Sequence, residues 1–134
     1  MKTHPLDKAL DLVHSDIQAG CFTGATSPDY WNMVGPFGGT TAAVMLQAVL
    51  RHPDLLGEPV AVTVNYAAAV GEGAFEVLAV PVRTNRSTQH WTIQMSQARA
   101  DGKPHVTTTG TAVTAVRRET WGTSDLPMPE APPP

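Results

Sequence analysis

The sequence predicts an α+β fold in which an antiparallel sheet wraps around one buried helix. Two observations lead to this prediction: one strongly apolar helix lies in the first half, and most of the chain after it alternates with a period of two. A curved antiparallel sheet buries such a helix without needing a second sheet. With 134 residues the chain supports one core rather than two. We therefore expect a single domain over 1–120 and an extended, mobile, proline-rich tail over 121–134.

Two helices are expected before the sheet. In the central one, Ala42 to Val49 contain a single polar residue, Gln47, so this helix should be buried nearly all round. It should end near residues 51–52, because Pro53 prevents its continuation. An earlier helix is predicted from apolar residues at helical spacing that follow Pro5, namely Leu6, Leu10, Val13 and Ile17.

The rest of the chain is expected to form a meander of four antiparallel strands. They are predicted over 59–69, 74–83, 88–99 and 105–117, where apolar and polar residues alternate. Pro81 within the second strand implies an edge or a bulge. A short strand around Phe22 is a further possibility.

Composition excludes several functional classes. The formal net charge of −3 argues against a nucleic-acid binder, which needs a basic excess. The single cysteine, Cys21, rules out an internal disulfide and fits a reducing compartment. No secretory signal is recognised, and no apolar run approaches the roughly 20 residues of a membrane span. The five histidines show no metal-ligand spacing. These features predict a cytoplasmic protein without a metal.

A glycine turn, Gly35-Pro-Phe-Gly-Gly39, comes directly before the central helix. Glycine lets a ligand approach the main chain closely, and a helix N-terminus presents free N–H groups and the positive end of its dipole. This arrangement suits a carbonyl oxygen that acquires negative charge during a reaction. A tight turn beside an ordinary core helix is the simpler explanation of the same residues.

Three blocks together resemble the N-terminal hot-dog half of the acyl-CoA thioesterase II type. They are the glycine turn, Arg83-Thr-Asn-Arg-Ser87 and Gln97-Ala-Arg-Ala-Asp-Gly102, in the family's order and spacing, within roughly residues 20–118. The resemblance implies a hot-dog fold, hydrolysis of acyl-CoA thioesters, and no cofactor apart from the coenzyme A of the substrate. Family members typically contain two units in one chain. We therefore expect either one half of a longer ancestor or a single unit that forms a homodimer or larger even assembly.

The resemblance also implies catalytic roles. The N–H groups of Gly39, Thr40 or Thr41 would hold the carbonyl oxygen. Family enzymes hold the attacking water with an Asp on the central helix, a Thr or Ser on the next strand and a Gln on the last. Those positions fall near Val44 or Met45, at Thr63 and near Thr111, so only the threonine is retained. Other candidates for holding or activating the water are Asn32, Asp29 and His90.

Substrate contacts follow from the same resemblance. The acyl chain is expected beside the central helix, against Met33, Phe37, Met45 and Trp91, with Gly38 in the glycine turn and Asn65 as a possible hydrogen-bonding partner. Arginine binds phosphate with a fork of donors, so the expected coenzyme A contacts are Arg83, Arg86 and Ser87. Two alternatives stay open. One is a non-catalytic acyl-CoA-binding half whose partner supplies the Asp, and the other is a hot-dog dehydratase or hydratase.

Overall fold

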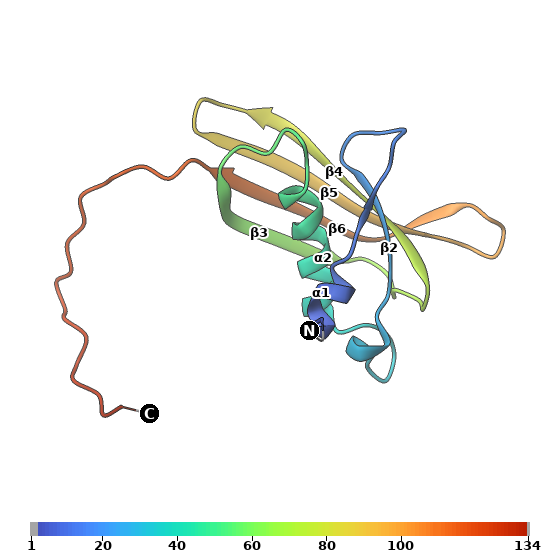
Figure 1. Cartoon of the computed structure of the whole chain (residues 1–134), viewed down its shortest axis with the longest axis horizontal. Coiled ribbons are helices and arrows are strands. Elements are labelled where there is room, and N and C mark those ends of the chain that lie inside the picture. Colours follow the sequence, from blue (N-terminus) through green and yellow to red (C-terminus); the bar gives the residue numbers. More distant parts are fainter. Residues whose placement is uncertain (1–2, 134) are drawn as a thin grey trace.

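The computed structural model describes residues 3–133 and contains a six-stranded antiparallel sheet with its helices on one face (Figure 1). The predicted α+β architecture is confirmed. In chain order the elements are α1 (Pro5–Ala9), β1 (Val13–His14), β2 (Cys21–Ala25), a 3-10 helix (Pro28–Tyr30), α2 (Gly38–Leu50), β3 (Glu58–Tyr66), β4 (Ala74–Thr84), β5 (Thr88–Ala98) and β6 (Pro104–Ala115). Residues 116–133 contain neither helix nor strand and run away from the sheet. The prediction for residue 134 lies outside the described residues, and so do residues 1 and 2.

The strand order is β1-β2-β4-β5-β6-β3, which corrects the predicted four-strand meander. Strands β4, β5 and β6 do form a meander, but β3 pairs with β6 and not with β4. Alternation of apolar residues shows which face of a strand is buried, and it does not identify the strand's neighbour. As a result β3 is an edge strand of the sheet.

The predicted N-terminal helix is much shorter than its apolar spacing indicates. Helix α1 ends at Ala9, and Val13 and Ile17, expected on its buried face, are 65% and 98% exposed. Leu12 enters the core instead, while Val13 and His14 pair with β2. Pairing with β2 satisfies the backbone of these residues in place of further helix. The possible strand around Phe22 is present as β2.

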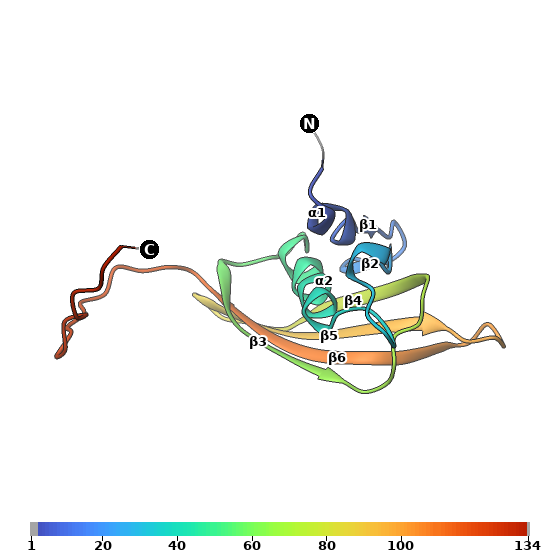
Figure 2. The same ribbon diagram turned by 90° about the horizontal axis from the view of Figure 1, so that it is seen from below.

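The two faces of the sheet differ in character. Trp91, Ile93 and Met95 of β5 are buried against α2, as their alternation predicts. The sheet curves under α2, which lies on this inner face (Figure 2). The opposite, outer face carries exposed polar residues, including the directly paired Thr63 and Thr111. Residues directly opposite each other on paired strands share a face.

Helix α2 is buried on one side only, so the expectation of burial nearly all round is wrong. Its core side includes Val44, Met45 and Ala48, each at most 3% exposed. Leu46 and Gln47 on another side are half-buried, and Leu50 is 37% exposed. Pro81 lies at an irregularity in the pairing of β4 with β5, beyond Leu78, where the pairing of β4 with β2 ends, so the predicted edge or bulge is confirmed. Within residues 3–133, no helix has the length and apolar character needed to cross a membrane.

Candidate functional site

The segment before α2 forms a tight loop that fixes the start of the helix. The Tyr30 carbonyl accepts a hydrogen bond from the Phe37 N–H at 2.8 Å, and the Gly35 carbonyl accepts one from the Asn32 N–H at 2.7 Å. Trp31 and Pro36 form an isolated antiparallel bridge between these two bonds. The loop therefore holds Gly38 and the first turn of α2 in a defined position.

Two backbone N–H groups at the start of α2 are available to a ligand. The Thr40 and Thr41 N–H groups both donate to the Phe37 carbonyl, at 3.0 and 3.3 Å. Phe37 provides no side-chain cap. Among the described residues, no acceptor is found for the N–H groups of Gly38 and Gly39. The expected N–H donors at Thr40 and Thr41 are thus engaged within the helix, and the donors left free are those of Gly38 and Gly39.

A groove of about 220 Å³ lies beside this helix end. Its lining includes Asn32, Gly38 and Thr41, together with Tyr66 from the end of β3 and the small residues 68–69. The Tyr66 hydroxyl donates to the Gly38 carbonyl at 2.6 Å. The Asn32 side-chain oxygen accepts the Met33 N–H at 2.6 Å, which holds that amide close to its own backbone. The groove therefore combines the free N–H group of Gly38, a phenol and the small side chains of residues 68–69.

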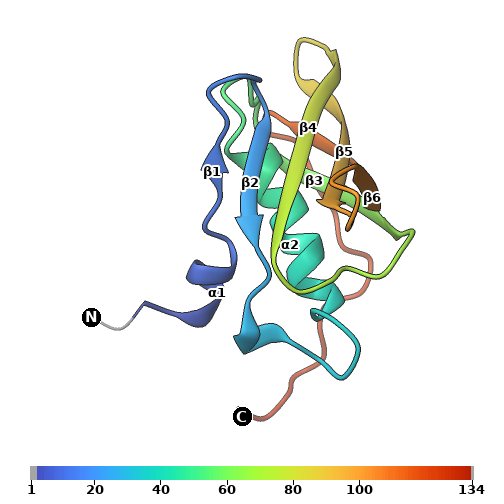
Figure 3. The same cartoon turned by 90° about the vertical axis from the view of Figure 1, so that its right-hand side faces the viewer.

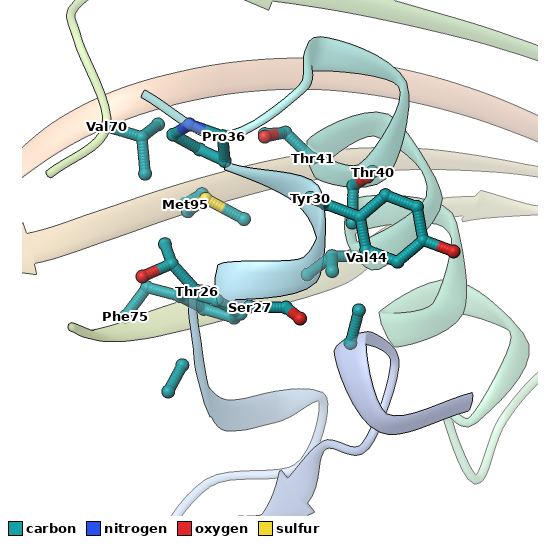
Figure 4. A pocket seen from close by; sticks show the side chains of 12 residues that line it. Thr26, Ser27, Tyr30, Pro36, Thr40, Thr41, Val44, Val70, Phe75 and Met95 are labelled. Carbon is teal, nitrogen blue, oxygen red and sulfur yellow. The ribbon is translucent and has the colours of Figure 1, made fainter. Parts of the chain in front are cut away.

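A small, mainly apolar cavity of about 20 Å³ lies next to the groove (Figure 4). Pro36, Thr41 and Val70 line both spaces, so the cavity and the groove adjoin at these residues. The remaining lining comes from the core and from the segment around the 3-10 helix, including Tyr30. Thr40 and Thr41 are buried and border this cavity, so their side chains face it rather than open solvent.

The predicted acyl-chain contacts are divided between surface and core. Phe37 is 58% exposed, and a Cβ built on Gly39 would collide with its ring, so the ring lies over Gly39. Met33 is 95% exposed at the tip of the loop. Met45 and Trp91 are fully enclosed in the core and cannot touch a ligand in this conformation. Of the predicted acyl contacts, only Phe37 and Met33 are accessible.

Thr63 and Asn65 lie on the outer face of the sheet, away from α2. Their neighbours in β3, Val64 and Tyr66, face the core and the start of α2 respectively. Thr63 is paired with Thr111, and Asn65 borders a hollow on the outer face together with Thr109. Successive strand residues point to opposite faces. Within one chain, therefore, neither side chain can act jointly with the free N–H groups of Gly38 and Gly39.

The residues expected to contact coenzyme A lie at the other end of the molecule. Arg83 lies near the end of β4, and Arg86 and Ser87 lie in the turn that follows, where the Arg83 Nε donates to Asn85 Oδ1 at 2.9 Å. The Gln89 side chain, next to this turn, bonds to the segment that follows the C-terminus of α2. Figure 3 shows the β4–β5 turn and the loop before α2 at opposite ends. Since α2 has 13 residues, the separation is about 20 Å.

The groove carries no acid or base of its own. None of its ten described lining residues is an aspartate, glutamate or histidine. Asp29 is exposed on the 3-10 helix, and His90 is exposed on the outer face of the sheet. In the described part of the chain, no three His, Cys, Asp or Glu side chains are grouped to hold a metal ion. The site can therefore polarise a carbonyl, but it lacks a group to deprotonate water.

Two ionisable side chains with shifted pKa values lie away from the groove. Burial raises the pKa of the Cys21 thiol, and the neighbouring Glu76 carboxylate raises it further. Burial also lowers the pKa of His52, and His14 lowers it further, against an opposing effect of Asp54. Cys21 is thus a protonated, 5% exposed thiol, which does not suit a nucleophile.

Sequence reasoning missed Tyr66 and the small residues 68–70 as parts of the site. In the sequence, Tyr66 is one position in the alternation of the strand predicted over 59–69. Its hydroxyl next to a helix N-terminus depends on how β3 crosses the end of α2, which alternation does not encode. The glycine turn was found because its composition is itself unusual.

Comparison with known proteins identifies the family. The family described as acyl-CoA thioesterase N-terminal domain matches residues 27–115, about two thirds of the chain. The chain belongs to the acyl-CoA thioesterase N-terminal domain family. The family match agrees with the resemblance noted in the three sequence blocks. No curated protein matches this chain.

Solved structures give this family member the hot-dog fold. A conserved protein of unknown function with a hot dog fold from Alicyclobacillus acidocaldarius is 50% identical, with a TM-score of 0.84, over 99% of this chain and 47% of that one. A putative thioesterase II from Thermobifida fusca YX is 19% identical, with a TM-score of 0.76, over 96% and 46%. The acyl-CoA thioesterase II TesB2 from Mycobacterium marinum is 20% identical, with a TM-score of 0.71, over 96% and 44%. This acyl-CoA thioesterase domain thus spans about half the length of these three relatives.

Proposed function

We propose that this chain is an acyl-CoA thioesterase-like unit that binds an acyl-CoA thioester in the groove beside α2. The observation that carries the proposal is the free N–H group of Gly38, which lines the groove at the start of α2, with the free N–H group of Gly39 next to it in the chain. These groups would donate hydrogen bonds to the thioester carbonyl oxygen, and the positive end of the helix dipole would favour the negative charge formed on that oxygen. The single buried cysteine supports a reducing, cytoplasmic location.

Hydrolysis needs more than this groove provides. Water attacks the carbonyl carbon, the C–S bond breaks, and the proton from water must reach the departing thiolate. A base is required to take that proton, and the groove lining contains none. We therefore propose that a second hot-dog unit supplies the base. That unit would be another copy of this chain or another half of a longer one.

The exposed edge of the sheet supports pairing with a second unit. Within the described residues β3 has a partner, β6, on one side only. Val60, Val62 and Tyr66 on this edge are 67%, 43% and 56% exposed, and no charged residue follows Glu58 in the strand. Long, uncharged apolar edges favour association with another strand.

Pairing through β3 would also account for the separation of the predicted site residues. If β3 of each unit pairs antiparallel with the other, the two units run in opposite directions. The partner's β4–β5 turn then lies at the same end of the joint sheet as this chain's α2 N-terminus. Arg83, Arg86 and Ser87 of one unit would thereby serve the groove of the other, and the substrate would lie between the two.

The missing base favours one second candidate, an acyl-CoA-binding unit that does not hydrolyse its ligand. Thiol release from a panel of acyl-CoAs, measured alongside acyl-CoA binding, separates the two candidates. Gly39→Pro removes one free N–H from the first turn of the helix, where proline is tolerated. Gly39→Ala is the matched control, because it keeps the N–H and also meets the Phe37 ring.

Thiol release that falls in Gly39→Pro and persists in Gly39→Ala supports the thioesterase. Saturable binding without release, weakened by Gly39→Pro, supports the binding unit. Neither binding nor release, in the chain alone or mixed with a second hot-dog unit, contradicts both.

A further inference from the structure

The cavity behind the groove has features of a subsite for the end of an acyl chain. Its walls are mainly apolar, with Val44, Phe75 and Met95 each no more than 6% exposed. It adjoins the groove in which the thioester carbonyl is proposed to bind, because Pro36, Thr41 and Val70 line both spaces. A chain that extends past Thr41 therefore enters an apolar space.

One wall of this cavity differs from the others. Val44, Val70, Phe75 and Met95 belong to the packed core, whereas Tyr30 is half-buried and comes from a three-residue 3-10 helix. The Tyr30 N–H donates to the Ser27 carbonyl at 3.2 Å, and the Tyr30 carbonyl accepts a hydrogen bond from the Phe37 N–H. Both backbone polar groups of Tyr30 are therefore hydrogen-bonded. In Figure 4 the Tyr30 ring lies beside Thr40 and Val44. Tyr30 is thus the aromatic side chain of the lining that is not buried in the core.

We propose that this cavity receives the terminal carbons of the acyl group and that Tyr30 sets the longest chain accepted. The inference rests on the proposed acyl-CoA binding. The cavity measures about 20 Å³, and about 10–15 Å³ is already needed for one water molecule. It therefore admits an end of about methyl or ethyl size. Longer chains must displace Tyr30 or leave their remaining carbons in the open groove, so added methylenes should gain little further affinity.

The test measures the binding of S-alkyl-CoA thioethers, which cannot be hydrolysed, from ethyl to octyl. Each methylene that becomes buried contributes about 0.8 kcal/mol, or about a fourfold change in Kd. For the natural chain we expect affinity to rise from ethyl to butyl and then to stop rising. We call the chain length at which the rise stops the break. For Tyr30→Ala we expect it to continue rising to octyl, with at least a tenfold gain of octyl over butyl.

Two further variants control for indirect effects. Tyr30→Phe keeps the ring and should retain the natural profile. Val44→Ile adds one methylene to the helix side of the lining and should move the break to a shorter chain. Thermal unfolding of each variant verifies that it is folded.

The outcomes separate this inference from the proposed function. An affinity that rises steadily to octyl in the natural chain, or an unchanged break in Tyr30→Ala, overturns the inference and leaves acyl-CoA binding intact. Failure of every thioether to bind, together with failure of the acyl-CoA panel to bind in the first assay, overturns both. A break that moves as expected supports the chain-length role of Tyr30, even if no thiol release is found in the hydrolysis assay.

Discussion

The Tyr66 hydroxyl donates a 2.6 Å hydrogen bond to the carbonyl oxygen of Gly38. That carbonyl belongs to the same peptide group as the Gly39 N–H, one of the two free donors at the groove. By holding one end of this planar group, Tyr66 fixes the direction of the N–H at the other end. The bond also polarises the peptide and so strengthens the N–H as a donor.

Replacing Tyr66 by phenylalanine removes this bond while keeping the ring. We expect a loss of about 1 kcal/mol in the free energy of unfolding, measured by urea denaturation. We also expect weaker acyl-CoA binding, because the Gly39 N–H is less well oriented. An acyl-CoA Kd equal to that of the natural chain would show that Tyr66 does not position the donor.

Gly20 occupies a position that no other residue fits. Its φ is +75°, and a Cβ there would collide with the Ala79 carbonyl and lie 2.6 Å from the His52 ring. Gly20→Ala should therefore lower the free energy of unfolding by more than about 2 kcal/mol. Gly102 has φ +76° with nothing within 4 Å, so Gly102→Ala isolates the backbone strain, about 1 kcal/mol. Equal losses in the two variants would contradict the packing argument.

His52 makes stability depend on pH. Its pKa in the folded chain lies below the ordinary 6.5, mainly because it is buried. As pH falls below 6.5, the unfolded chain binds a proton that the folded chain does not, so stability decreases with a slope of up to about 1.4 kcal/mol per pH unit. His52→Asn, which can still accept the Asp54 N–H, should flatten this dependence in urea titrations between pH 7 and 5. A slope identical to the natural one would assign the effect to another group.

The uncharged edge strand predicts concentration-dependent association. Val62→Lys places a charge on β3 and should shift sedimentation from dimer to monomer. Val82→Lys is the control, since Val82 is 57% exposed but lies on β4, which β5 and β6 separate from β3. If Val62→Lys sediments as the natural chain does, units do not pair through β3.

Burial should make Cys21 unreactive in the folded chain. Its raised pKa keeps the thiol protonated at neutral pH, and the side chain is 5% exposed. A disulfide reagent should label it slowly in buffer and rapidly in denaturant. Rapid labelling under native conditions would contradict the buried placement.

Most helices and strands can be predicted from the sequence, but which strands pair with one another cannot always be predicted. Trp91, Ile93 and Met95 identify the buried face of β5 because alternation directly reflects burial. The same pattern in β3 says nothing of its pairing with β6, which depends on where the chain passes the end of α2. The spacing of Val13 and Ile17 predicted a helix longer than α1. This prediction was wrong because apolar residues at helical intervals also occur by chance in irregular segments.

The location of the site could also be predicted from the sequence, whereas its detailed geometry could not. The glycine turn pointed to the start of α2, since glycines before an apolar helix are informative by composition alone. That Gly38 rather than Thr40 has a free N–H depends on the bond from Thr40 to Phe37, a detail of the first turn. The distance between Arg83 and the groove depends on the strand order, so it could not be predicted locally.

The end of β6 lies beside the start of β3, with Ala115 opposite Glu58. The chain therefore leaves the sheet at the very edge proposed to receive a second unit. Two separate copies must meet by diffusion, and their pairing depends on protein concentration. A second unit tethered at this point would face the edge at a high effective concentration, so a weak edge contact would suffice to keep the two together.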